Sequence, residues 1–119
     1  MAKRASFPEY DLHERGATVD EALARLERIV SAARGGGPSA FAVITGYGSS
    51  GGTSMIKSAV ISACRRYLRQ NHIAGFLDGE FAGDIFSAQY QSFPAAARIP
   101  VDYKRSPNPE LVFICVGAR

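Results

Sequence analysis

The chain has 119 residues, which is enough for one domain with a single hydrophobic core and too few for two. Hydrophobic residues make up 46% and charged residues 21%, as in an ordinary globular protein, and no run approaches the roughly 20 apolar residues of a membrane span. The net charge of +3 is compatible with a nucleic-acid partner without requiring one. The N-terminus lacks the apolar core of a signal peptide, so we expect a cytoplasmic protein with no membrane partner.

The first third of the chain predicts a strand followed by a helix. Residues 1–6 form a basic tail, and polar and apolar residues alternate within residues 7–13, which is typical of a short strand. Thr18 and Glu21 have the spacing of a capping box, and apolar residues then recur every three or four positions. The run of glycines before Pro38 ends this helix.

A second strand, a glycine-rich loop and a second helix follow. The strand is expected at residues 41–45, the helix at residues 54–70, and the loop at residues 46–52 contains four glycines. Glycine has no Cβ, so the backbone of such a loop can approach a ligand closely. The first turn of the helix adds unpaired N–H groups and the positive end of a dipole. The loop therefore predicts an anion site for a phosphate or a carboxylate.

The remaining strands are expected at residues 73–77 and 111–116, the latter apolar enough to be buried on both faces. Between them, residues 78–110 carry aromatic residues, four prolines and one short predicted helix at residues 84–91. We expect the aromatic residues to form a satellite core, and Cys64 and Cys115 to be reduced core residues.

The order of the elements predicts an α/β layer fold in which the first two strands are parallel. The carboxyl end of the first strand, with Asp11 and His13, then lies at the same edge of the sheet as Thr45 and Gly46. Ligands of open α/β sheets bind at that edge. The sequence thus predicts one cleft that holds an acid, an imidazole and a glycine loop.

Asp11 and His13 are two residues apart on a strand, so both side chains point to one face. The carboxylate can orient the imidazole for general-base catalysis, or the pair can hold a water or a metal ion. The alternative is that Asp11 caps a backbone turn and His13 packs against it. With no third ligand in the pattern, a preformed structural metal site is not expected, and Mg²⁺ is the one cofactor left open.

The loop has alternative interpretations as well. Residues 46–53 fit part of a nucleotide-binding P-loop, but Gly52 stands where the lysine is needed, so nucleotide hydrolysis is not expected. The loop could also be a turn with no ligand, and Tyr47 could stack on an unpaired base. The residues that we expect to bind phosphate are Thr45, Gly46, Tyr47, Gly48, Ser49, Gly51, Gly52, Thr53 and Lys57.

Three arginines, at positions 65, 66 and 69, lie near the end of the second predicted helix. Arg65 is roughly 17 Å along the helix from Ser54, too far to reach a phosphate at the loop. Cations in the last turns of a helix complement its dipole, which is the favoured interpretation. The alternative is that they follow the backbone of a nucleic acid further along its length.

The combination of Asp11-Leu12-His13 with Thr45-Gly46-Tyr47-Gly48 resembles the Smr (small MutS-related) domain, over residues 7–77 and the last strand. That family has an L-D-L-H strand end, a helix, and an H/T-G-x-G loop that opens a second helix. The resemblance implies a two-layer β-α-β-α-β-β sandwich with a mixed four-stranded sheet, similar to the C-terminal domain of translation initiation factor three. Residues 78–110 would then be an insertion before the last strand.

The resemblance also implies a nucleic-acid partner and an endonuclease activity that nicks DNA or cleaves RNA. Asp11 and His13 would then be the catalytic residues, and the glycine-rich loop would bind a phosphate. The chain departs from the family pattern at Tyr10, at Glu14 in place of a glycine, and at Tyr47 in place of a basic residue. Two alternatives therefore stay open: a non-catalytic RNA- or ribosome-binding module, and a domain for a small phosphorylated ligand with the insertion as a lid.

Overall fold

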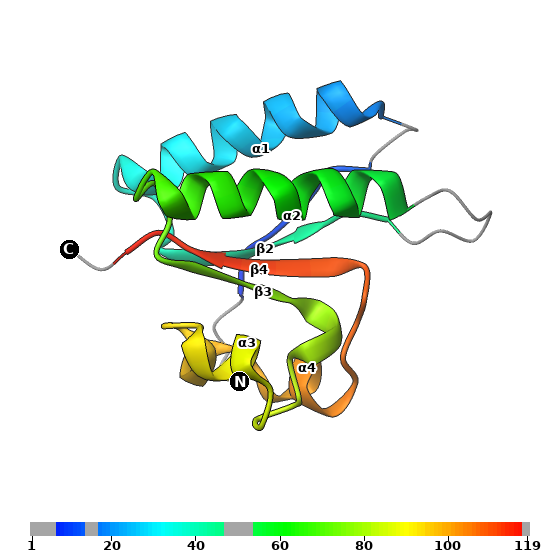
Figure 1. Ribbon diagram of the computed structural model, residues 1–119, viewed down its shortest axis with the longest axis vertical. Helices are drawn as coiled ribbons and strands as arrows, with labels where there is room; N and C mark the ends of the chain where they lie inside the picture. The colour runs from blue at the N-terminus through cyan, green and yellow to red at the C-terminus, as the bar shows by residue number, and fades with distance from the viewer. Residues whose placement is uncertain (1–6, 14–16, 47–53, 118–119) are drawn as a thin grey trace, which may run out of the picture.

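The computed structural model describes residues 7–13, 17–46 and 54–117 and contains one four-stranded sheet with helical segments on both faces (Figure 1). The strands and long helices are β1 (Glu9–Asp11), α1 (Val19–Arg34), β2 (Ala40–Ile44), α2 (Ser54–Arg69), β3 (Gly75–Asp78) and β4 (Leu111–Cys115). Between β3 and β4 lie four short turns of helix: η2 (Gly79–Phe81), α3 (Ala88–Ser92), η3 (Ala96–Arg98) and α4 (Val101–Arg105). The predicted order of elements is confirmed.

The sheet is mixed, with strand order β1-β2-β4-β3. β1 pairs with β2 in parallel, as predicted, and β4 lies antiparallel between β2 and β3. All five residues of β4 are buried, which confirms that this strand is covered on both faces. The parallel pair brings the carboxyl ends of β1 and β2 to one edge of the sheet.

Both long helices cover the same face of the sheet, and their carboxyl ends lie together at one end of the layer (Figure 1). The capping box of α1 is formed: the Thr18 hydroxyl accepts from the Glu21 N–H, and the Glu21 carboxylate accepts from the Thr18 N–H. The apolar faces of both helices pack against the sheet. The buried residues between the helices and the sheet include Leu26, Val30, Val60 and Cys64.

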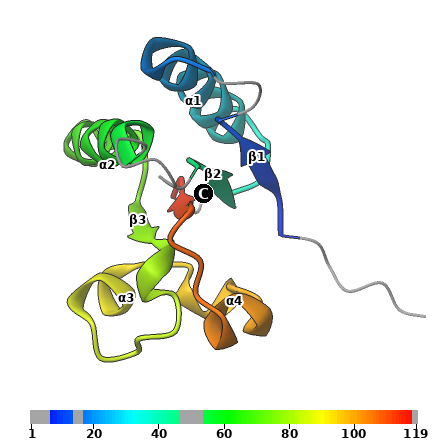
Figure 2. The ribbon, with the colours of Figure 1, turned by 90° about the vertical axis from the view of Figure 1, so that its right-hand side faces the viewer.

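The other face of the sheet is covered by the segment between β3 and β4, which is predicted to be an insertion and which we call the insertion, so the structure differs from the two-layer prediction by a further helical layer (Figure 2). The physical reason is that β2 and β4 place apolar side chains on this face as well, and these must be covered. Phe93 and Ile99 of the insertion are buried against them, and the Phe113 ring contacts Tyr103 edge-on at 5.3 Å between centroids. The predicted satellite core is therefore a second core on the sheet. The short helix expected at residues 84–91 is shorter and begins later, at Ala88.

Both cysteines are buried free thiols, as expected, with Cys64 in the core under α1 and α2 and Cys115 in the core under the insertion. In the part of the chain that the structure describes, none of the helices combines the length and the apolar character needed to cross a membrane.

Candidate functional site

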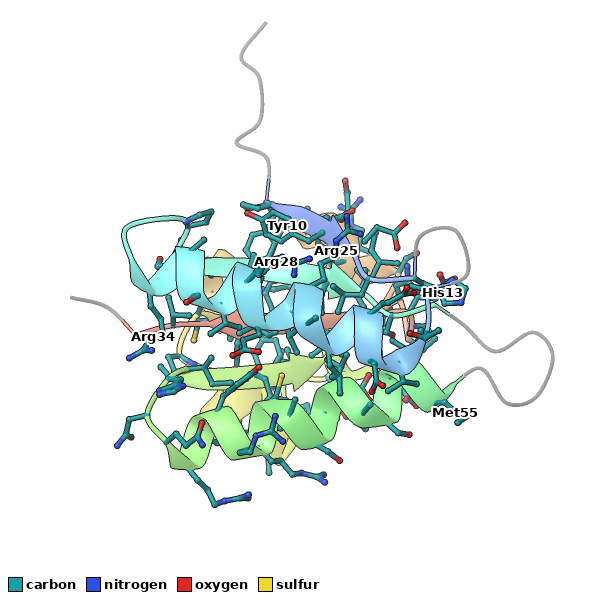
Figure 3. The ribbon with its side chains drawn as sticks, turned by 90° about the horizontal axis from the view of Figure 1, so that it is seen from above. Tyr10, His13, Arg25, Arg28, Arg34 and Met55 are labelled. Carbon is teal, nitrogen blue, oxygen red and sulfur yellow. The ribbon has the colours of Figure 1, made fainter. Side chains whose placement is uncertain are left out.

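His13 and Gly46 meet at the carboxyl edge of the β1–β2 pair, which brings the two sequence motifs together. The Leu12 N–H donates to the Ile44 carbonyl at 2.9 Å and extends the strand pairing by one residue. Leu12 itself is fully buried, which anchors the turn, and the His13 side chain is exposed at this end of the molecule (Figure 3). A Cβ atom on Gly46 would lie 2.6 Å from Cγ and Cδ2 of the imidazole, so the ring lies directly against the Gly46 backbone.

Gly46 is required here for two independent reasons. Its φ angle is +82°, a conformation that residues with a Cβ rarely adopt. The close approach of the His13 ring also leaves no room for a side chain. A glycine at this position therefore allows the imidazole to pack directly against a bend in the backbone at the edge of the sheet.

Asp11 holds the turn on which His13 stands. Its Oδ1 atom accepts a hydrogen bond from the His13 N–H at 2.8 Å, and the Arg25 side chain donates to the Asp11 carbonyl oxygen at 3.1 Å. Of the two sequence interpretations, this hydrogen bond corresponds to the one in which Asp11 caps a backbone turn. Asp11 thereby fixes the position of His13 through the main chain.

Thr45 lies beneath this site and faces the interior. The residue is fully buried, and both its N–H and its hydroxyl donate to the Glu110 carbonyl oxygen, at 2.7 and 2.9 Å. These bonds tie the end of β2 to the segment that leads into β4. Thr45 therefore supports the backbone that carries Gly46.

Lys57 lies in the first turn of α2, and its Nζ atom is 2.8 Å from Oδ1 of Asp78, at the carboxyl end of β3. The side chains are only 16% and 14% exposed, so the pair is partly withdrawn from solvent. Asp78 Oδ1 also accepts the Glu80 N–H at 2.9 Å. The sequence reasoning missed Asp78, although its place directly after an apolar strand, at the ligand edge of the sheet, was a usable signal.

Six of the residues predicted to bind phosphate lie outside the described residues: Tyr47, Gly48, Ser49, Gly51, Gly52 and Thr53. Within the described residues, the structure contains no group of three or more His, Cys, Asp or Glu side chains placed to hold a metal ion.

The family model of the Smr domain matches residues 10–83, which is more than half of the chain and includes both motifs of the site. This chain belongs to the Smr domain family. Smr domains generally bind nucleic acids. In this Smr domain the match ends just after η2, so most of the insertion lies outside the matched range. No curated protein and no solved structure matches the chain.

Proposed function

We propose that this Smr domain binds nucleic acid at the carboxyl edge of its sheet and cleaves a phosphodiester bond held over His13 and Gly46. The observation that carries the proposal is the contact of the exposed His13 imidazole with the Gly46 backbone. It places a group able to transfer protons beside the start of a glycine-rich loop that leads into α2.

The proposed roles follow from this geometry. His13 is the proton-transferring group, and Asp11 is a positioning residue because it holds the His13 turn. Loop residues Gly48, Ser49, Gly51, Gly52 and Thr53 would bind a phosphate largely through backbone N–H groups, and Tyr47 would stack on an unpaired base. Lys57 would add a positive charge, attenuated by its ion pair with Asp78.

The test measures nicking of supercoiled plasmid DNA and cleavage of a labelled RNA, each with Mg²⁺ and with EDTA, which also determines the metal requirement. His13→Ala should abolish cleavage and leave binding largely intact. Asp11→Asn keeps an oxygen that can accept the His13 N–H, so it should spare binding and much of the cleavage, whereas Asp11→Ala removes the acceptor and should lose cleavage. Equal cleavage by the wild-type protein and His13→Ala would contradict the catalytic assignment.

A second candidate is a non-catalytic RNA-binding module. Two contacts favour it. The Asp11 carboxylate accepts a hydrogen bond from the His13 main chain, and Asp78 neutralises the charge of Lys57 in an ion pair. This function predicts binding that Tyr47→Ala weakens, with no cleavage under either metal condition. A thermal shift with inorganic phosphate or nucleotides, and none with oligonucleotides, would instead indicate a small phosphorylated ligand.

A further inference from the structure

A second hollow lies at the opposite edge of the sheet, where α1 and α2 end. Two adjoining cavities of about 440 and 340 Å³ share Arg34 and His72 in their walls. Glu27, Val30, Ser31, Arg66, Tyr67 and Gln70 line the smaller cavity beside these two residues. We call this region, defined by Arg34, Arg66, Tyr67, Gln70 and His72, the basic hollow.

Positive charge is concentrated around the basic hollow. The carboxyl-terminal halves of the two helices, residues 27–34 and 62–69, are described throughout and contain five arginines and one acid, Glu27. Of these, Arg34, Arg66 and Glu27 line the hollow, whereas Arg28 lines a separate cavity with Tyr10 and Arg25. The arginines are exposed. In Figure 3, Arg34 lies at the end of the helical layer opposite to His13 and Met55. Two arginines against one carboxylate leave the wall of the smaller cavity with a net positive charge, which raises the local concentration of anions.

Stacking orders the wall of this hollow. The Arg66 guanidinium carbon lies 5.4 Å from the centroid of the Tyr67 ring. The His72 ring stacks on the same tyrosine, with 6.2 Å between centroids and 25° between planes. Burial of the Tyr67 phenol, followed by the charge of Glu27, raises the pKa of Tyr67, so the phenol stays neutral. A guanidinium held against an aromatic ring loses less freedom when it binds a phosphate.

The helix dipole explains part of this arrangement, because cations near helix carboxyl ends are stabilising. The helix dipole acts only on cations in the last turn of its own helix, however. It does not explain why Arg34 of α1 and Arg66 of α2 line the same cavity. The shared cavity is therefore the observation that points to a ligand.

The hollow and the His13–Gly46 site lie at opposite ends of the same helical layer. α2 has 16 residues, so it spans about 24 Å. Phosphates along one strand of duplex DNA are spaced 3.4 Å apart along the axis, so about seven base pairs cover this distance. One nucleic acid lying along α1 and α2 could contact both ends.

We propose that the basic hollow is a second phosphate-backbone site, which binds the same nucleic acid as the His13–Gly46 site one helix length away. The proposal rests on the proposed function, since it assumes a nucleic-acid partner. It adds a minimum ligand length: a duplex shorter than about seven base pairs reaches only one of the two sites.

The experiment measures the affinity of the full chain for labelled DNA duplexes of 4 to 16 base pairs at several salt concentrations, repeated with RNA. The wild-type protein is compared with Arg34→Gln/Arg66→Gln. The matched control is Lys104→Gln/Arg105→Gln in α4, which removes the same charge on the other face of the sheet. Thermal unfolding of each variant verifies that it is folded.

We expect wild-type affinity to rise steeply once the duplex reaches about seven base pairs. The hollow variant should lose this rise, bind the 16-mer at least about tenfold more weakly, and show a salt slope smaller by about 2, as for two lost phosphate contacts. The control should stay within about twofold of the wild type. Wild-type affinity of the hollow variant for long duplexes, or equal weakening on the 4-mer and the 16-mer, would overturn the second site and leave the proposed function standing. If the wild-type protein binds none of the duplexes or RNAs, the proposed function itself fails.

Discussion

The two faces of the sheet are covered in different ways. On one face lie two helices of 16 residues each, with regular apolar stripes. On the other lie short turns of three to five residues, connected by segments rich in proline. Both nevertheless contain fully buried phenylalanines, Phe41 under the helices and Phe113 under the insertion. The comparison shows that an irregular insertion can serve as a full core layer, which makes it a structural cover of the sheet.

The strongest test of this equivalence compares Phe41→Ala with Phe113→Ala. Each should lower the free energy of unfolding by about 3–5 kcal/mol, because each removes a fully buried ring. Urea unfolding followed by circular dichroism measures both values. A loss below about 1 kcal/mol for Phe113→Ala, or a separate early transition, would show that the insertion is not part of the cooperative core.

The next comparison is between two glycines with positive φ. At Gly36 a Cβ would meet nothing within 4 Å, so Gly36→Ala should cost only the strain of its φ of +116°, about 1–2 kcal/mol. Gly46→Ala adds a collision with the His13 ring and should cost more. It should also weaken nucleic-acid binding more than Gly36→Ala does, although Gly36 lines the larger cavity of the basic hollow. Equal binding by the two variants would remove Gly46 from the proposed site.

The Lys57–Asp78 pair joins α2 to the end of β3 and can be tested by a double-mutant cycle with Lys57→Met and Asp78→Asn. We expect a coupling of about 1 kcal/mol in the free energy of unfolding, since the pair is partly buried. The two single variants should act on nucleic-acid binding in opposite directions. Asp78→Asn releases the lysine charge and should strengthen binding, whereas Lys57→Met should weaken it. Unchanged binding in both would assign the pair a structural role only.

The smallest expected effect is the pH dependence from the two thiols. Burial raises the pKa of Cys64 to about 12 and also raises that of Cys115, so both thiols remain protonated in the folded protein. The unfolded chain ionises at lower pH, so these thiols contribute their full stability below the unfolded pKa and lose it as pH rises towards the folded pKa. Between pH 8 and 9 the loss should be a few tenths of a kcal/mol for Cys64, with a loss in the same direction for Cys115. Urea unfolding at both pH values measures this loss in the free energy of unfolding. Cys64→Ala should remove the share of the pH dependence that comes from the thiol under the two long helices.

Much of the fold was predictable because it depends on local patterns. The capping box at Thr18 and the apolar periods of α1 and α2 lie within single segments, as does the alternation around β1. The parallel pairing of β1 and β2 followed from the helix between them. The similarity to the C-terminal domain of translation initiation factor three stays a prediction. The insertion layer was not predictable, because its short turns are stabilised by contacts with a sheet that is distant in sequence.

The sequence by itself determined that Asp11, His13 and Gly46 share one edge of the sheet, because strand direction alone brings them there. Only the tertiary structure decided what each group contacts. In the folded chain the Asp11 carboxylate accepts the His13 N–H, and the Thr45 hydroxyl donates to the Glu110 carbonyl oxygen. Lys57 forms an ion pair with Asp78. The tertiary structure also placed Arg34 beside Arg66 and His72 at the opposite edge. These contacts join residues from separate elements, and their geometry depends on how those elements pack, which no local pattern encodes.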